Sequence, residues 1–190
     1  MNAAAVTYWR LKLRALFWLL LGRRQAAVDA FGDMLQHWPD DAYALASRAH
    51  VLAQLGRRDD AIADARRLTT AHPQRSAGDW FNLAFLLEAA GRNDEAEVAF
   101  RRAVALDPKL DRAWYGLGLV LIRQGRLDEA VGALKRNTEL QPMSPYGWYQ
   151  LARVHVDRRD DDEARRIIRH LAGFEPQVAA QLQRETGLKP

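Results

Sequence analysis

The hydrophobic pattern of the chain predicts pairs of helices. Around Gly125, in LIRQGRLDEA, an apolar stretch leads into a short polar turn, and glycine suits the left-handed residue that ends a helix. Asp128 is placed to cap the next helix, in which Ala130 and Leu134 lie four residues apart on one apolar face. Pro142 then stops or redirects the chain. The pattern therefore predicts a helix–turn–helix unit.

Three residue types recur with the period of this unit, 34 or 35 residues. The prolines are Pro39, Pro73, Pro108, Pro142 and Pro176, the glycines are Gly22, Gly56, Gly91 and Gly125, and the alanines are Ala27, Ala61, Ala96, Ala130 and Ala164. Arg159 stands at the fifth glycine position. Three series with the same spacing and the same order are not expected by chance, so the sequence predicts a chain built of repeated helix pairs.

These positions carry a family resemblance: the chain resembles the tetratricopeptide repeat proteins over almost its whole length. The family pattern is W-x2-L-G-x2-Y…A-x3-F…P. It is matched at Trp114, Leu117, Gly118, Leu121, Ala130, Leu134 and Pro142, at Trp80, Leu83, Ala84, Leu87, Ala96, Phe100, Ala103 and Pro108, at Trp148, Leu151, Ala152, Ala164, Ile168 and Pro176, and less fully at Leu45, Ala49, Leu52, Ala61, Ala65 and Pro73. The small residues let the two helices of a repeat cross closely.

The resemblance implies an all-α fold, an α-solenoid in which antiparallel helix pairs form a right-handed superhelix. We expect a single domain over residues 1–190 with five repeats. Their expected ranges are 8–41, 42–76, 77–110, 111–144 and 145–176. A C-terminal capping helix is expected at 177–187, where Val178 and Leu182 share a face and Gly187 is a stop signal.

The stretch Arg10–Arg24, RLKLRALFWLLLGRR, has three possible roles: a signal peptide, a membrane anchor or the first helix of the fold. Extending the repeat backwards places Leu11, Ala15, Trp18, Gly22, Ala27, Phe31, Met34 and Pro39 on the family positions. The uninterrupted apolar run, Ala15–Leu21, is far shorter than the ~20 residues of a membrane span. No small-residue cleavage site follows it. We therefore expect the first helix of a first repeat, ending at Gly22.

This helix is apolar nearly all round, whereas a terminal repeat normally has a polar outer face. Either residues 1–7 cover it, or it packs on a partner, a second copy or a membrane surface. The candidate residues for such an N-terminal interface are Leu16, Phe17, Leu19 and Leu20.

Composition narrows the function. The chain has no cysteine, which excludes disulfides, zinc–thiolate sites and a cysteine nucleophile. The net charge of +4 is small, and its arginine doublets are spread among acids, so no nucleic-acid partner is expected. The expected location is cytoplasmic, with the periphery of the inner face of a membrane as the alternative.

Motifs for catalysis or metal binding are missing from the sequence. No two of His37, His50, His72, His155 and His170 have metal-ligand spacing, and His155 is expected to be a hydrogen-bonded packing residue. The acidic run DRRDDDEA at 157–164 occupies an interhelical turn, where Asp161 or Asp162 would cap a helix. The sequence has no phosphate loop, nucleophile elbow or dinucleotide fingerprint. We therefore expect no enzyme activity, no cofactor and no metal.

The resemblance implies a concave face, lined by the first helix of each repeat, that binds peptides or protein segments. The family positions that face inward are occupied by His50, Phe81, Asn82, Phe85, Arg112, Tyr115, Leu119, Tyr146, Tyr149 and Arg153. We predict an aromatic and aliphatic groove for a ligand with apolar anchors, and with acidic residues near Arg112 and Arg153. The alternative for any one aromatic residue is that it only packs neighbouring helices together.

One subtype of the family clamps a peptide's C-terminal carboxylate with lysine, asparagine and arginine side chains. Asn82 matches one position of that clamp, and Arg112 replaces a lysine. Ala46, His50 and Gly116 stand where other clamp residues belong. The clamp is mostly missing, so capture of a C-terminal carboxylate is not expected. The leading hypothesis is a non-enzymatic interaction scaffold; the alternative is a membrane-associated or self-associating assembly factor that uses the N-terminal helix.

Overall fold

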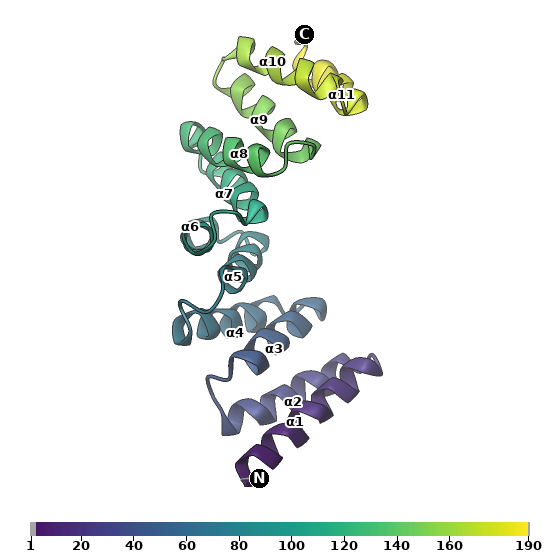
Figure 1. Ribbon diagram of the computed structural model, residues 1–190, viewed down its shortest axis with the longest axis vertical. Helices are drawn as coiled ribbons and strands as arrows, with labels where there is room; N and C mark the ends of the chain where they lie inside the picture. The colour runs from purple at the N-terminus through teal and green to yellow at the C-terminus, as the bar shows by residue number, and fades with distance from the viewer. Residues whose placement is uncertain (1–2, 190) are drawn as a thin grey trace. The chain divides into compact units, whose positions relative to one another are not determined.

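The computed structural model describes residues 3–189, and within that range it contains eleven α-helices and no β-strand (Figure 1). The helices are α1 (Ala3–Leu20), α2 (Arg24–His37), α3 (Ala42–Gln54), α4 (Arg58–Ala71), α5 (Ala77–Ala89), α6 (Asn93–Leu106), α7 (Asp111–Arg123), α8 (Leu127–Leu140), α9 (Pro145–Asp157), α10 (Asp161–Ala172) and α11 (Pro176–Thr186). The all-α helical-repeat fold that the sequence predicts is confirmed.

The chain forms two compact units. One ends at Gly91 and holds α1 to α5, and the other begins at Arg92 and holds α6 to α11. Within each unit, every helix packs on the next one along the chain, and α11 also packs on α9. Figure 1 shows the successive helices of each unit side by side. The boundary falls in the turn between α5 and α6, inside the range 77–110, so the division into five repeats stays a prediction.

The turn between the two helices of each pair contains a residue whose backbone is in the left-handed conformation. Gly125 has a φ of +72°, and the N–H of Arg126 donates to the carbonyl of Leu121 across the turn, at 2.9 Å. This is the glycine-dependent helix end that the sequence predicts. Arg159 adopts the same conformation, with a φ of +61°, although its Cβ disfavours it.

The residues that cap the helices differ from the prediction. Asp128 does not cap α8, because the helix already begins at Leu127, two residues after the left-handed Gly125. Its carboxylate instead lies 2.7 Å from the guanidinium of Arg158. In the acidic run, neither Asp161 nor Asp162 is the cap. Asp160 has that role, and its carboxylate accepts from the N–H of Glu163 at 3.4 Å. Both helices begin earlier in the sequence than predicted, because each starts within two residues of its left-handed turn residue.

Small residues let α7 lie close to its neighbours. A Cβ atom on Gly118 would lie 2.7 Å from Cγ of Leu134 in α8, and Leu134 is fully buried. On another side of α7, a Cβ atom on Gly116 would collide with the ring of Phe100 in α6. Helices at this separation leave no room for a methyl group, so the expected close crossing within this helix pair is confirmed.

A repeated hydrogen bond fixes the link from one helix pair to the next. The indole Nε1 of Trp148 donates to the carbonyl of Pro142 at 2.8 Å, and Trp114 donates to Pro108 at 3.0 Å. Trp80 donates to Pro73 at 2.9 Å, across one more residue than in the other two links. The tryptophan and proline of the repeat pattern are therefore partners.

Candidate functional site

The predicted groove residues lie on first helices of the helix pairs, in two sets. His50 is on α3, and Phe81, Asn82 and Phe85 are on α5, in the first unit. The second unit holds Arg112, Tyr115 and Leu119 on α7 and Tyr146, Tyr149 and Arg153 on α9.

In the first unit, α5 carries a pair of phenylalanine rings. The rings of Phe81 and Phe85 stack with centroids 6.4 Å apart and planes 23° apart. The side chain of Phe85 is 56% exposed, while Leu83 and Leu87 on the other side of the helix are buried. Packing of α5 therefore uses the leucine face and leaves Phe85 at the surface.

His50 belongs to a polar cluster on the same unit. Its Nε2 lies 2.9 Å from the amide nitrogen of Gln54, one turn further along α3. The amide oxygen of Gln54 accepts from Nε of Arg24, at the start of α2, at 3.0 Å. His50 is exposed, so this part of the surface presents a hydrogen-bonding imidazole rather than an apolar floor.

In the second unit, α9 and α11 share a polar cluster. The hydroxyl of Tyr149 donates to Oε2 of Glu185 at 2.6 Å, and the amide of Gln181 donates to Oε1 at 2.8 Å. Nη1 of Arg153 lies 3.3 Å from the Tyr149 hydroxyl and 3.5 Å from Glu185. The hydrogen bond from Tyr149, followed by that from Gln181, lowers the pKa of Glu185. Glu185 is therefore held as a carboxylate beside two of the predicted groove residues.

Glu185 is the residue that the sequence prediction missed. Arg153 was expected to meet an acidic ligand, and the structure gives it an internal carboxylate instead. The i, i+4 spacing of Gln181 and Glu185 on α11 was a signal for a polar face. The apolar face with Val178 and Leu182 is the one from which the sequence predicts this helix, and Glu185 lies outside that pair.

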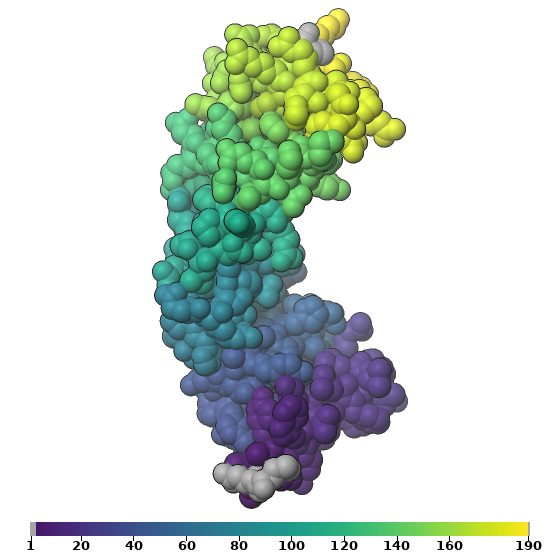
Figure 2. All heavy atoms as spheres, viewed as in Figure 1, coloured from purple at the N-terminus to yellow at the C-terminus, as the bar shows by residue number. Residues whose placement is uncertain are grey.

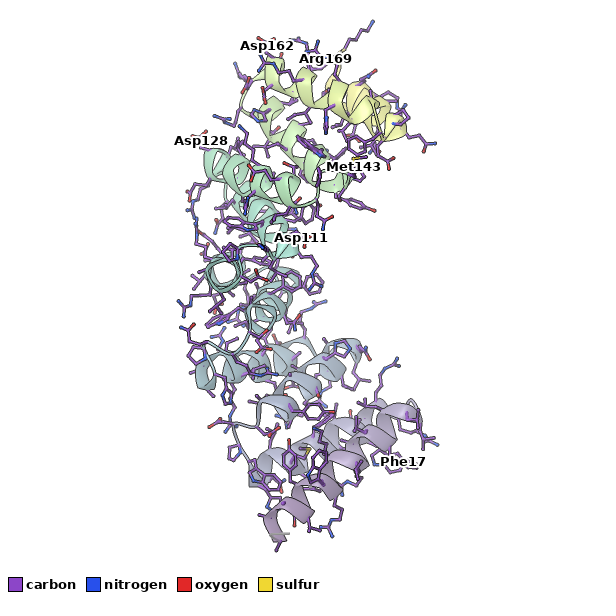
Figure 3. All side chains as sticks on the ribbon, viewed as in Figure 1. Phe17, Asp111, Asp128, Met143, Asp162 and Arg169 are labelled. Carbon is purple, nitrogen blue, oxygen red and sulfur yellow. The ribbon has the colours of Figure 1, made fainter. Side chains whose placement is uncertain are left out.

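Exposure differs among the remaining groove residues of the second unit. Tyr146 is 71% exposed and follows Met143, which is 67% exposed in the turn after α8 (Figure 3). Tyr115 and Leu119 are half-buried one turn apart on α7, and Arg112 is exposed at its beginning. The apolar surface of this unit is therefore greatest at the start of α9.

The predicted N-terminal interface residues divide between two faces of α1. Leu16, Phe17 and Leu20 are exposed, by 40%, 52% and 84%. The purple atoms of α1 lie at the surface of the first unit (Figure 2), and Figure 3 labels Phe17 on this helix. Leu19 packs on the core of the unit, because it follows Ala15 and Leu11 along the buried face at four-residue spacing. The sequence left open that residues 1–7 cover this helix. Residues 3–7 do not cover it, because they are part of α1 itself, and residues 1 and 2 lie outside the described residues.

His155 is the packing residue that the sequence predicts. It is 2% exposed, and its Nδ1 lies 2.9 Å from Oδ2 of Asp160, the residue that caps α10. The hydrogen bond from His155 lowers the pKa of Asp160. No group of three metal-ligating side chains is found over residues 3–189. None of the helices in that range is long and apolar enough to cross a membrane.

The comparison with protein families agrees with this architecture. The tetratricopeptide repeat family matches residues 19–76 and 81–142, which is more than half of the chain. The chain therefore belongs to the tetratricopeptide repeat family, whose members bind other proteins or peptides.

Solved structures of similar fold cover nearly the whole chain. A structure of MamA superposes with a TM-score of 0.84 at 21% identity, covering 92% of this chain and 94% of MamA. MamA from Desulfovibrio magneticus RS-1 gives 0.76 at 19% identity, covering 97% and 98%. YrrB, described as a TPR protein with an unusual peptide-binding site, gives 0.80 at 17% identity, covering 90% and 88%. At these identities the likeness shows the fold alone.

A curated relative matches by sequence over a shorter stretch. The small glutamine-rich tetratricopeptide repeat-containing protein 2 of Mycosarcoma maydis is 30% identical over 83 residues, or 44% of this chain. The chain spans only 23% of that protein's length.

Proposed function

We propose that this chain is a non-enzymatic scaffold that binds a peptide or helix of another protein on the faces formed by the first helices of its repeats. The observation that carries this proposal is the stacked pair on α5, in which Phe85 stays 56% exposed. Exposed aromatic side chains of this kind carry binding energy at interfaces.

A cytoplasmic location stays a prediction.

The ligand in this proposal supplies apolar anchors for Phe85 and Tyr146, the two most exposed predicted groove aromatics. An acidic ligand residue near Arg112 stays a prediction. At Arg153 such a residue meets a site that already holds the carboxylate of Glu185, 3.5 Å away. Recognition at α9 is therefore more apolar than the sequence alone suggests.

Both aromatic residues are exposed, so the test variant Phe85→Ala/Tyr146→Ala is expected to fold. The matched control is Val98→Ala, which removes an exposed apolar side chain on α6, outside the predicted groove. Each protein is immobilised and exposed to native lysate, and captured proteins are quantified by mass spectrometry. A protein that the wild type and the control retain, but that the aromatic variant loses, is then purified and its binding measured directly.

We expect the aromatic variant to lose at least about thirtyfold in affinity on direct measurement. This is the effect of removing two hot-spot side chains that contribute more than about 1 kcal/mol each. If every captured protein binds the aromatic variant as well as it binds the wild type, the assignment of these residues to a ligand surface is wrong.

A further inference from the structure

Helix α1 has two apolar faces, and only one of them is used in packing. Leu11 and Ala15 are buried, and Tyr8, Trp18 and Leu19 pack against the same core. The opposite face carries large apolar side chains at steps of three or four residues. This outer stripe consists of Val6, Trp9, Leu13, Leu16, Phe17, Leu20 and Leu21, each at least 40% exposed.

The outer stripe extends over most of the helix. An α1 of 18 residues is about 27 Å long, and the stripe begins at Val6 and ends at Leu21. Leu13 is 59% exposed and Leu20 is 84% exposed. Scattered surface leucines are ordinary, but a continuous row of this length marks an interaction surface.

Charge indicates what this surface meets. The first 28 residues contain five Lys or Arg residues and no acid, whereas the remaining residues hold 23 Lys or Arg and 24 acids. The cations are Arg10, Lys12, Arg14, Arg23 and Arg24. Arg14 forms an ion pair with Asp33, whereas Lys12 keeps its charge over the face of the Tyr43 ring, 3.9 Å from the ring centroid. The positive charge of the chain is therefore concentrated around the outer stripe.

This combination argues against a second copy as the occupant. Two stripes packed face to face bring basic margins together, and α1 has no carboxylate to compensate them. The stripe is also the outer surface of a single helix rather than a hollow. Two hollows of the same unit, of about 500 and 290 Å³, are lined by residues from α2 to α4 and not by the stripe. A flat, deformable and negatively charged surface matches the outer stripe and its cations better than a second copy does.

We propose that α1 attaches the protein to the surface of a membrane rich in anionic phospholipid. The helix lies in the plane of the interface, with the outer stripe among the upper acyl chains and the cations among the headgroups. Trp9 and Phe17 supply aromatic rings of the kind that favour this depth. Because Leu11 and Ala15 stay on the opposite side, the helix binds lipid without leaving its own unit.

The test uses the full chain and vesicles of two compositions: phosphatidylcholine alone, and phosphatidylcholine with about one-third phosphatidylglycerol. Bound protein is measured by flotation at low and high salt. The variant Leu13→Glu/Leu20→Glu places two charges on exposed positions of the stripe. Its control, Val98→Glu/Met143→Glu, makes the same change of charge at exposed apolar positions of the other unit.

We expect the wild type and the control to float with the anionic vesicles, and the stripe variant to lose at least tenfold in partitioning. Replacing Arg10 and Arg23 by glutamine is expected to lower partitioning onto anionic vesicles about fivefold per cation, and to leave partitioning onto neutral vesicles unchanged. High salt is expected to weaken the binding of the wild type to anionic vesicles.

Two results overturn the proposal: a wild type that floats with neither composition, and a stripe variant that binds as well as the control. Sedimentation velocity on the same proteins separates the other occupants. A wild type that stays off vesicles but self-associates through the stripe identifies a second copy, and one that stays off vesicles and is monomeric excludes both a lipid surface and a second copy. The groove residues Phe85 and Tyr146 are outside the stripe, so this test fails or succeeds independently of the proposed function.

Discussion

The close contact at Gly118 leads to a prediction whose sign can be worked out from the structure. In Gly118→Ala, the new methyl group lies 2.7 Å from Cγ and 2.8 Å from Cδ2 of Leu134. Leu134 is fully buried, so it has no open space into which to turn. Overpacking of this kind costs about 1–3 kcal/mol, while alanine in place of glycine in a helix contributes about 1 kcal/mol of stability. We expect a net loss of about 1 kcal/mol.

A second glycine provides the control. Gly132 lies on α8, is exposed, and a Cβ atom there has no atom within 4 Å. Gly132→Ala therefore keeps the gain in helix propensity without the clash, and we expect it to raise the free energy of unfolding by about 0.5–1 kcal/mol. Urea unfolding followed by circular dichroism measures both variants. If Gly118→Ala is as stable as Gly132→Ala, the close crossing of α7 and α8 is not present in solution.

Three further predictions concern polar contacts. Asp64→Ala removes the buried carboxylate that Arg48 contacts at 2.6 Å through two nitrogens; we expect a loss of about 2 kcal/mol in the free energy of unfolding, and an unchanged urea midpoint contradicts it. The lowered pKa of Glu185 stabilises the fold above the unfolded value of about 4.3, and this stabilisation is lost as the pH falls through the folded value. Glu185→Gln should therefore make the fall in melting temperature between neutral and acidic pH smaller than in the wild type, and an unchanged pH dependence refutes this. Trp148→Phe keeps a six-membered aromatic ring but removes the hydrogen bond to the carbonyl of Pro142; we expect a cost of about 1 kcal/mol in the free energy of unfolding by urea, and unchanged stability contradicts it.

The repeat period was enough to predict helix pairs and the positions of their turns. This worked because a left-handed residue is a local requirement, and glycine meets it at Gly22, Gly56, Gly91 and Gly125. The caps were harder, since the distance from the turn to the helix start is only two residues. A shift of one residue then changes which aspartate has the role.

The contacts of the candidate site were less predictable because they join distant positions. Tyr149 and Glu185 are 36 residues apart, and their contact depends on how α11 lies against α9. The outer stripe raised a related difficulty. The sequence shows that α1 is apolar nearly all round, but only the packed structure separates Leu19 from Leu20.

The hydrogen bond between a repeat's tryptophan and the preceding proline has a consequence for how such a chain changes length. Its acceptor is a backbone carbonyl, so it does not depend on the side chains around it. In the Trp80 bond, the donor and the acceptor are one residue further apart in the sequence than in the other two bonds. Its length still differs by only 0.1 Å from each of theirs. A helix pair that begins with tryptophan and ends with proline therefore carries both halves of a standard connector. Duplication or loss of a whole pair therefore leaves a connector at each junction, and the Trp80 link shows that one extra residue can be accommodated there.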